Sequence, residues 1–245
     1  DGTFDVCKEF LEDSELKYIQ LEQNMGMAAS QYECFARATG KYLWILSDDD
    51  FIEPNAIKLI LRTISSNLDL YAFNYKSNVD DASPPIGPRD SHRFEFGYEL
   101  MNFRSVGHMS GLVYHTDLAL IHARKLRDIF PLNFFNTTRG IFGLVFASLA
   151  HNTSSSAHYE GKVIFSATEQ KNLDYNGLIL LCLTNFTTFS IMHKLEIVGD
   201  KIYKFQIKLI SARIRRSYIR WYPTLNDKDA IFVDYLLTPF FSNSL

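Results

Sequence analysis

The stretch Tyr42–Asp50 (YLWILSDDD) constrains this chain more than any other, because a short apolar run ends abruptly in three aspartates. An apolar run of this length is typical of a buried strand. Three adjacent carboxylates repel one another, so a fold that holds them together usually has a cation present. Mg²⁺ and Mn²⁺ prefer oxygen ligands and keep coordination positions open for phosphate. The alternative is a solvated acidic turn ahead of the helix predicted to begin at Pro54.

The composition is that of a globular protein of 245 residues, 47% of them hydrophobic, with a formal net charge of −3. This length suits one large domain, or one domain with an appendage. The small net charge gives no reason to expect nucleic acid as a partner. Cys7, Cys34 and Cys182 are widely spaced in apolar patterns. Reduced core thiols are therefore predicted, and with them a cytoplasmic location.

The first part of the chain alternates between helical and strand patterns. Helices are predicted over 3–12 and 27–39, strands over 16–21, 42–47 and 69–75, and a helix from Pro54 with Ile57, Ile60, Leu61 and Ile64 on its core face. Such alternation predicts right-handed crossovers and an α/β fold with a mostly parallel sheet flanked by helices. Ligands bind such sheets at the carboxyl ends of the strands, where the three aspartates fall.

The pattern becomes less regular after the Pro-, Ser- and Asp-rich segment 76–93. Strands are predicted at about 107–114 and 162–167, and helices at about 117–128 and 137–151. In the tail, 201–222 combines large apolar residues with Lys and Arg and predicts a basic amphipathic helix. Such a helix either packs on the domain or lies on an anionic lipid surface. The apolar run 178–183 is far shorter than the about 20 residues that a membrane span needs.

Several short motifs follow one another along the chain: Asp1-Gly2-Thr3-Phe4-Asp5, Asn24-x-Gly26, Ala38-Thr39-Gly40-Lys41-Tyr42, and Ser47-Asp48-Asp49-Asp50 with Pro54. This ordered set resembles the family 2 glycosyltransferases, inverting enzymes of the GT-A (Rossmann-like) fold that use nucleotide-activated sugars. The last group is similar to the acidic DXD motif of the family. The resemblance covers residues 1 to about 75 and extends more loosely to about 170. Serine before three aspartates looks most like the abequosyltransferase-like branch of bacterial enzymes that builds O-antigen.

The resemblance implies a role for each matching residue. Asp1 and Asp5 would border the nucleotide base pocket, Asn24 and Gly26 would shape its wall, and Asp48 would contact the ribose or the metal. Asp49 would bind the Mn²⁺ or Mg²⁺ that bridges the diphosphate, with Asp50 as a further ligand or an orienting group. The cation would neutralise charge on the departing nucleoside diphosphate. Ser110, in the turn 107–111, would line the acceptor side.

Two features of the family have no counterpart in the sequence. The family's first strand, which forms much of the nucleobase pocket, is expected ahead of Asp1. The family's Glu-Asp pair is expected near 136–139, which reads Asn-Thr-Thr-Arg. The base that takes the proton from the acceptor hydroxyl is therefore open. The candidates are two carboxylates and two imidazoles: Asp117, Asp128, His108 and His151. Helix capping explains Asp117 equally well, and a helix C-terminus explains His151.

The resemblance thus implies a metal-dependent inverting glycosyltransferase that transfers a hexosyl or deoxyhexosyl group. Its GT-A domain would span 1–172, with a nucleotide-sugar half at 1–75 and an acceptor half at 94–172, followed by a helical tail at 173–245. The donor would be a nucleotide sugar and the acceptor a lipid-linked saccharide in bacterial surface polysaccharide synthesis. The segment 201–222 would then contact the inner face of the cytoplasmic membrane.

Two other readings of the sequence compete with this one. A nucleotidyltransferase would also use carboxylates and Mg²⁺, but it would need a Gly-rich basic phosphate loop, and none is visible. A non-catalytic relative would bind a nucleotide sugar or a partner subunit, and the missing Glu-Asp pair favours it.

Overall fold

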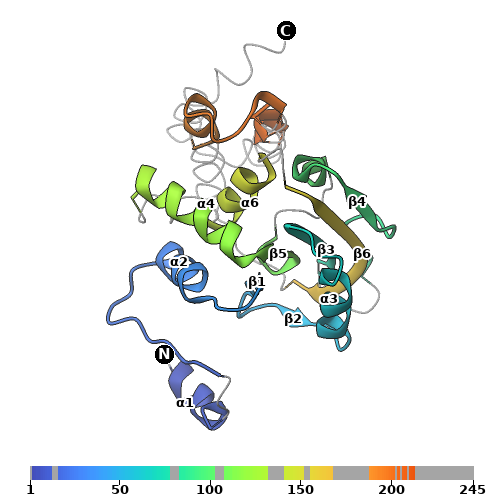
Figure 1. The fold of residues 1–245 in the computed structure, drawn as a ribbon. Helices are drawn as coiled ribbons and strands as arrows, with labels where there is room; N and C mark the ends of the chain where they lie inside the picture. Colours follow the sequence, from blue (N-terminus) through green and yellow to red (C-terminus); the bar gives the residue numbers. More distant parts are fainter. Residues whose placement is uncertain are drawn as a thin grey trace, which may run out of the picture.

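The computed structural model describes residues 2–12, 16–77, 83–102, 108–131, 141–151, 155–167, and 188–212 without 202, 205 and 209. The helices are α1 (Thr3–Cys7), α2 (Met27–Arg37), α3 (Ala56–Ile64), α4 (Thr116–Ile129) and α6 (Ile141–His151). The strands are β1 (Tyr42–Trp44), β2 (Phe51–Ile52), β3 (Leu70–Lys76), β4 (His92–Phe94), β5 (Leu112–His115) and β6 (Ala157–Ser166). Short 3₁₀ turns are η1 (Lys8–Phe10), η2 (Gly97–Asn102) and η3 (Met109–Gly111). Figure 1 shows the helices arranged around one curved sheet.

The six described strands form one sheet in the order β1–β5–β3–β6–β2, with β4 paired to β6. β5 lies between β1 and β3 and is antiparallel to both, whereas β3 and β6 are parallel. The α/β class is confirmed, but the described sheet is mixed rather than mostly parallel. The reason is that β5 inserts between β1 and β3, which run in the same direction, and pairs with both in the antiparallel sense. Local alternation of helices and strands carries no information about such an insertion.

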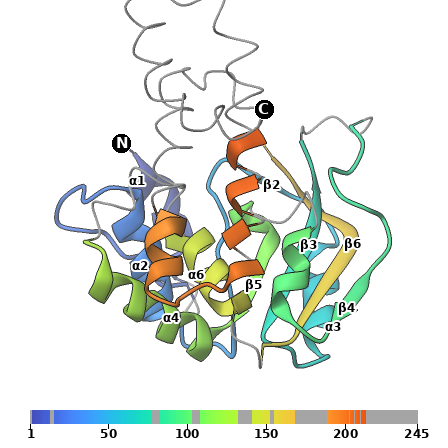
Figure 2. The same ribbon diagram turned by 90° about the horizontal axis from the view of Figure 1, so that it is seen from above.

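Alternate residues of the central strands face two separate apolar clusters. In β3, Leu70 and Ala72 belong to the larger cluster, and Tyr71 and Phe73 belong to the smaller one. This is the period-2 alternation of a strand buried on both faces. Helices α2, α4 and α6 contribute to the larger cluster, and α3 contributes to the smaller one. Figure 2 shows the resulting layers, with α2, α4 and α6 on one side and the sheet with α3 on the other.

Two local predictions are wrong. Residues 16–21, predicted as a strand, form no regular element, and Leu16 and Ile19 are each 45% exposed. In the described part of the chain no strand lies beside them to pair with their backbone groups. Helix α3 is also turned from its predicted orientation. Ile57 and Leu61 are each 61% exposed, and the buried side chains are Ala56, Leu59, Ile60 and Thr63.

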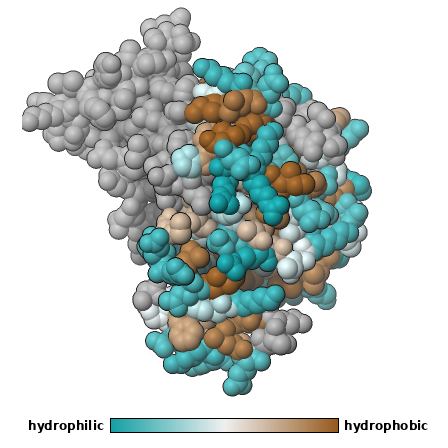
Figure 3. All heavy atoms as spheres, turned by 60° about the vertical axis from the view of Figure 1, so that its left-hand side comes forward, coloured by the Kyte–Doolittle hydropathy of each residue, from teal (hydrophilic) through white to brown (hydrophobic). Residues whose placement is uncertain are grey.

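The N-terminal segment exposes apolar side chains. Helix α1 stands away from the sheet (Figure 1), and it buries none of its residues. Phe4, Val6 and Phe10 are among the exposed large apolar residues, and brown side chains are visible at this lower end of the molecule in Figure 3. Cys34 is also exposed, so the prediction that it is a core thiol is wrong.

The described residues of the tail are helical over 188–194 and, leaving out 202, 205 and 209, over 200–212; the rest of the helix predicted at 201–222 lies outside the described residues. Five of its side chains join the core cluster formed by α2, α4 and α6: Phe189, Met192, Ile197, Val198 and Ile210. The His193 ring links the two helices, since it lies 2.7 Å from Asp200 Oδ1 and stacks on Tyr203. Within the residues described, the model contains no helix with the length and apolarity needed to cross a membrane.

Candidate active site

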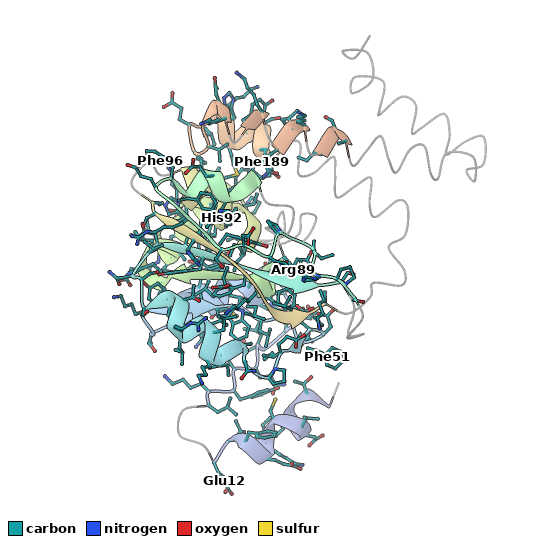
Figure 4. All side chains as sticks on the ribbon, turned by 90° about the vertical axis from the view of Figure 1, so that its right-hand side faces the viewer. Glu12, Phe51, Arg89, His92, Phe96 and Phe189 are labelled. Carbon is teal, nitrogen blue, oxygen red and sulfur yellow. The ribbon has the colours of Figure 1, made fainter. Side chains whose placement is uncertain are left out.

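The three predicted aspartates lie at one edge of the sheet, in residues 47–50, which we call the acidic turn. The chain leaves β1 through Ile45, which is 6% exposed, and reaches Ser47. The Asp50 amide donates to the Ser47 carbonyl at 3.4 Å and closes the turn. Because β1, β3 and β6 run in the same direction, their carboxyl ends meet at this edge. Phe51, which directly follows the turn, lies at the rim of the molecule (Figure 4) and is 57% exposed.

The three carboxylates of the acidic turn have different surroundings. Asp48 and Asp49 are exposed. The Ser47 hydroxyl donates to Asp49 Oδ1 at 2.5 Å and fixes the direction of that carboxylate. The Asp50 side chain, in contrast, is 2% exposed and points into the protein. The turn therefore presents two carboxylates to solvent and holds the third beneath them.

Ser110 in η3 connects the buried carboxylate to the rest of the turn. Its hydroxyl donates to Asp50 Oδ2 at 2.5 Å and accepts from the Ser47 amide at 2.9 Å. Its carbonyl accepts from the Trp44 indole N–H at 2.8 Å. The residue is 0% exposed. Ser110 was predicted to line the acceptor side, but in this structure its side chain faces the acidic turn and not solvent.

His108 lies beside the same buried carboxylate, within a cluster of aromatic rings. Its Nδ1 is 3.6 Å from Asp50 Oδ2. Its ring centroid is 5.0 Å from that of Tyr75 and 4.9 Å from that of Phe165. Tyr75 and Phe165 in turn stack at 4.9 Å. The ends of β3 and β6 thus provide the apolar wall against which the imidazole packs.

Three polar residues at this edge were not singled out from the sequence. Glu53 Oε1 accepts from the Ser166 hydroxyl at 3.0 Å and lies 3.5 Å from Lys76 Nζ. Lys76 ends β3 and Ser166 ends β6, so both lie at the carboxyl ends of strands. A polar residue at the end of a predicted strand could have marked Lys76 and Ser166 as candidates for the site. The sequence does not show, however, that β3 and β6 pair, so it could not show that their ends lie together.

A β-bulge beside Tyr75 is fixed by one buried side chain, Asn74. The register of β3 and β6 shifts on both sides of Asn74. Its Nδ2 donates to the carbonyls of Gly161 at 3.1 Å and of Gly87 and Pro88 at 3.0 Å each. Its Oδ1 accepts from the amides of Gly87 and Tyr75. The second register shift directly precedes Tyr75, whose ring packs against His108.

The other predicted donor-side residues lie elsewhere. Asp1 lies outside the described residues. Asp5 is exposed on α1 and pairs with Lys8 at 3.1 Å. Asn24 Oδ1 accepts from the Gly26 amide at 2.9 Å, and Gly26 has φ of +86° at the start of α2. This positive φ favours glycine and gives the Asn-x-Gly motif a local turn function, while its place in the wall of the nucleotide pocket stays a prediction.

Of the four predicted bases, His108 is the one that the described structure brings to the acidic turn. Asp117 lies in the first turn of α4, which follows β5 directly. Because β5 is antiparallel to β1, it ends at the opposite edge of the sheet, where the Thr116 amide donates to the Lys41 carbonyl ahead of β1. Asp128 lies near the far end of the same helix and is exposed. His151 ends α6, and its side chain lies outside the described structure, as does the segment 136–139.

The exposed carboxylates fit a divalent cation that is shared with a ligand. Mg²⁺ in nucleotide sites is commonly held by one or two carboxylates together with phosphate oxygens. Asp48 and Asp49 supply such a pair of hard oxygen donors. Among the described residues, no group of three or more His, Cys, Asp or Glu side chains is placed to enclose a metal by itself. Two carboxylates would leave the other coordination positions of such an ion to a bound ligand.

The fold is that of GT-A glycosyltransferases. A crystal structure of S. aureus TarS 1–349 matches with a TM-score of 0.58 and 16% sequence identity, and the match covers 100% of this chain and 66% of that structure. A second S. aureus TarS structure matches 94% of this chain and 39% of its own, again with a TM-score of 0.58 and 16% identity. At this identity the likeness concerns the fold.

Sequence comparison identifies the family. The chain is 29% identical over 82 residues to "Putative glycosyltransferase EpsH" of Bacillus subtilis (strain 168), a stretch of 33% of this chain and 24% of that protein. The chain thus aligns with only part of this relative's length. Residues 1–130, more than half of the chain, match Glycosyl transferase family 2. The chain belongs to Glycosyl transferase family 2.

Proposed function

We propose that the chain is a divalent-metal-dependent, inverting glycosyltransferase. It transfers a sugar from a nucleotide-sugar donor to a lipid-linked saccharide in bacterial surface polysaccharide synthesis. The observation that carries this proposal is the exposed pair Asp48 and Asp49 at the carboxyl-end edge of the sheet. The family assignment supports glycosyl transfer, with a nucleotide-sugar donor and a saccharide acceptor. The serine that precedes the three aspartates supports the abequosyltransferase-like branch and O-antigen synthesis.

The residues of the acidic turn would bind the donor diphosphate. Asp48 and Asp49 would hold Mn²⁺ or Mg²⁺, which supplies charge neutralisation for the departing nucleoside diphosphate. The Ser47 hydroxyl orients Asp49 at 2.5 Å, and this bond sets one ligand direction before the metal arrives. Such preorganisation limits the reorganisation needed during the reaction.

The acceptor would approach along the ends of β3 and β6, on the side of His108. Aromatic rings and one polar nitrogen meet there, 3.6 Å from the Asp50 carboxylate. An inverting transfer needs one group to take the proton of the attacking hydroxyl. His108 is the first side chain to test for that role, because Asp117 starts α4 at the opposite edge of the sheet and Asp128 is exposed near the far end of that helix.

The described part of the basic helix supports contact with anionic lipid. Lys201, Lys204 and Lys208 recur at helical spacing and are exposed, whereas Ile210 is 6% exposed and packs into the core. A helix held on its apolar side, with lysines outward, would place positive charge against acidic headgroups. This would bring the active site close to a lipid-linked acceptor.

Titration calorimetry of UDP, GDP, TDP and CDP into the full-length protein, with and without Mn²⁺, tests the donor site. We expect metal-dependent binding of one nucleotide. We expect the binding to be lost in Asp49→Ala and retained in Asp117→Ala, which removes an exposed carboxylate at the opposite edge. If the folded protein bound none of the four nucleotides, the glycosyltransferase proposal would fail and a non-catalytic role would take its place.

Co-sedimentation with vesicles tests the membrane contact separately. Vesicles containing phosphatidylserine should retain the wild-type protein more than pure phosphatidylcholine vesicles do. Replacing Lys201, Lys204 and Lys208 together by serine should abolish the difference. The matched control replaces three exposed lysines elsewhere, Lys58, Lys125 and Lys162, and should keep the difference. Equal retention by both types of vesicle would argue against an electrostatic membrane contact.

A further inference from the structure

We infer that Ser110 is a positioning residue, which acts through Ser47 and Asp50 to hold the acidic turn in its metal-binding shape. The inference rests on the proposed function, because it concerns the same metal site. It assigns Ser110 and Asp50 to one unit beneath the turn, with Asp48 and Asp49 as the groups that reach the metal. Asp50 then supports the site without binding the ion.

The Ser110 hydroxyl forms hydrogen bonds with both ends of the acidic turn. A single hydroxyl spans the base of the turn, accepting from the Ser47 amide at 2.9 Å and donating to Asp50 Oδ2 at 2.5 Å. Ser47 and Asp50 are the first and last residues of that turn. The bond between serine and carboxylate is charge-assisted and therefore stronger than one between neutral groups. Both ends of the turn are thus tied to one atom.

Ser110 and the Asp50 carboxylate are both buried. Ser110 is 0% exposed and the Asp50 side chain is 2% exposed. Water therefore cannot readily replace the hydroxyl if it is removed, and buried polar groups without partners are costly. The Trp44 indole, at 2.8 Å from the Ser110 carbonyl, fixes η3 against β1. The serine thus joins the turn to a rigid strand.

The consequence for the metal follows from geometry. The Asp49 carboxylate is oriented by Ser47, whose amide depends on Ser110. Removing the Ser110 hydroxyl should release both Ser47 and Asp50, so the two exposed carboxylates would no longer share a fixed separation. Groups that orient metal ligands typically change metal affinity by about 10–100-fold when they are removed. We expect Ser110→Ala to weaken Mn²⁺ binding by about tenfold or more.

The experiment measures Mn²⁺ affinity by electron paramagnetic resonance, in the presence of the nucleoside diphosphate that binds the wild-type protein. The variants are Ser110→Ala, Asp50→Asn and the double variant. The matched control is Ser148→Ala, which removes a serine that is 2% exposed and bonded to His122 in the α4–α6 interface. Thermal unfolding is recorded for each. If Ser110→Ala does not fold, Ser110→Cys keeps the volume with a weaker donor.

Three results decide the outcome. Weakened Mn²⁺ binding in Ser110→Ala but not in Ser148→Ala, with the double variant no worse than the poorer single variant, supports one unit. Unchanged Mn²⁺ affinity in Ser110→Ala, with only a lower melting temperature, would show that the serine is merely structural. Multiplying effects in the double variant would show that Asp50 acts on the metal independently and would also overturn the inference. Failure of the wild-type protein to bind any nucleotide would count against the proposed function.

Discussion

Replacing Asn74 by alanine should destabilise the protein out of proportion to the size of the change. Asn74 is 0% exposed and its amide makes five hydrogen bonds that fasten the β3–β6 bulge and the segment 87–88. The Gly161 carbonyl is buried there, and leaving such a group without a partner costs about 1–3 kcal/mol. The other bonded groups are more exposed, and water replaces part of what they lose. We expect a total loss of about 2–4 kcal/mol in the free energy of unfolding.

Urea unfolding followed by circular dichroism measures this loss, provided that the slope with denaturant stays unchanged. The matched control is Asn55→Ala, because Asn55 is exposed and its side chain makes no capping bond to α3. The control should change stability by less than about 0.5 kcal/mol. If Asn74→Ala were no more destabilising than Asn55→Ala, the buried amide would not be what holds the bulge together.

Three further predictions follow from single residues. His108→Phe keeps the ring packing against Tyr75 and Phe165 but removes the nitrogens, so it should lose turnover as fully as His108→Ala does; retained turnover would assign the residue to packing alone. Burial lowers the pKa of His158, with Glu160 partly opposing, so the folded state resists protonation. The free energy of unfolding of the protein should therefore fall as pH drops below about 6.5, because the unfolded chain takes up the proton more readily. Urea unfolding at pH 7.5 and 5.5 measures this fall, which should be smaller in His158→Gln. Gly161→Ala should fail to fold stably, because the added Cβ would lie 2.0 Å from the Arg89 carbonyl oxygen; a soluble variant with unchanged melting temperature would contradict this close approach.

The sequence predicts the position of the acidic turn but not the different surroundings of its three carboxylates. The strand that starts at Tyr42, the helix that follows the acidic turn and the turn at Asn24–Gly26 depend on local patterns and are present, although the strand ends at Trp44 and the helix begins at Ala56. Local patterns cannot show which carboxylate is buried. Asp48, Asp49 and Asp50 are chemically identical, and only the packing of η3 beneath the turn distinguishes them.

The wrong predictions have the same physical origin. Residues 16–21 alternate like a strand, but a strand also needs a partner, and alternation does not supply one. In α3 the sequence offers apolar residues around much of the helix, so periodicity alone could not choose the buried face; Ile57 and Leu61 are exposed while Leu59 is buried. The packing of Ala56, Leu59 and Ile60 in the smaller apolar cluster determines which face of α3 is buried.

The sequence by itself determined the kinds of elements, the acidic end of β1 and the resemblance to family 2 glycosyltransferases, because these depend on residues near one another in the chain. Only the tertiary structure decided that β5 separates β1 from β3, and that His108 and Ser110 meet Asp50 across about 60 residues of sequence. Contacts of that separation are fixed by how the whole chain buries its apolar surface, a property that no local pattern records.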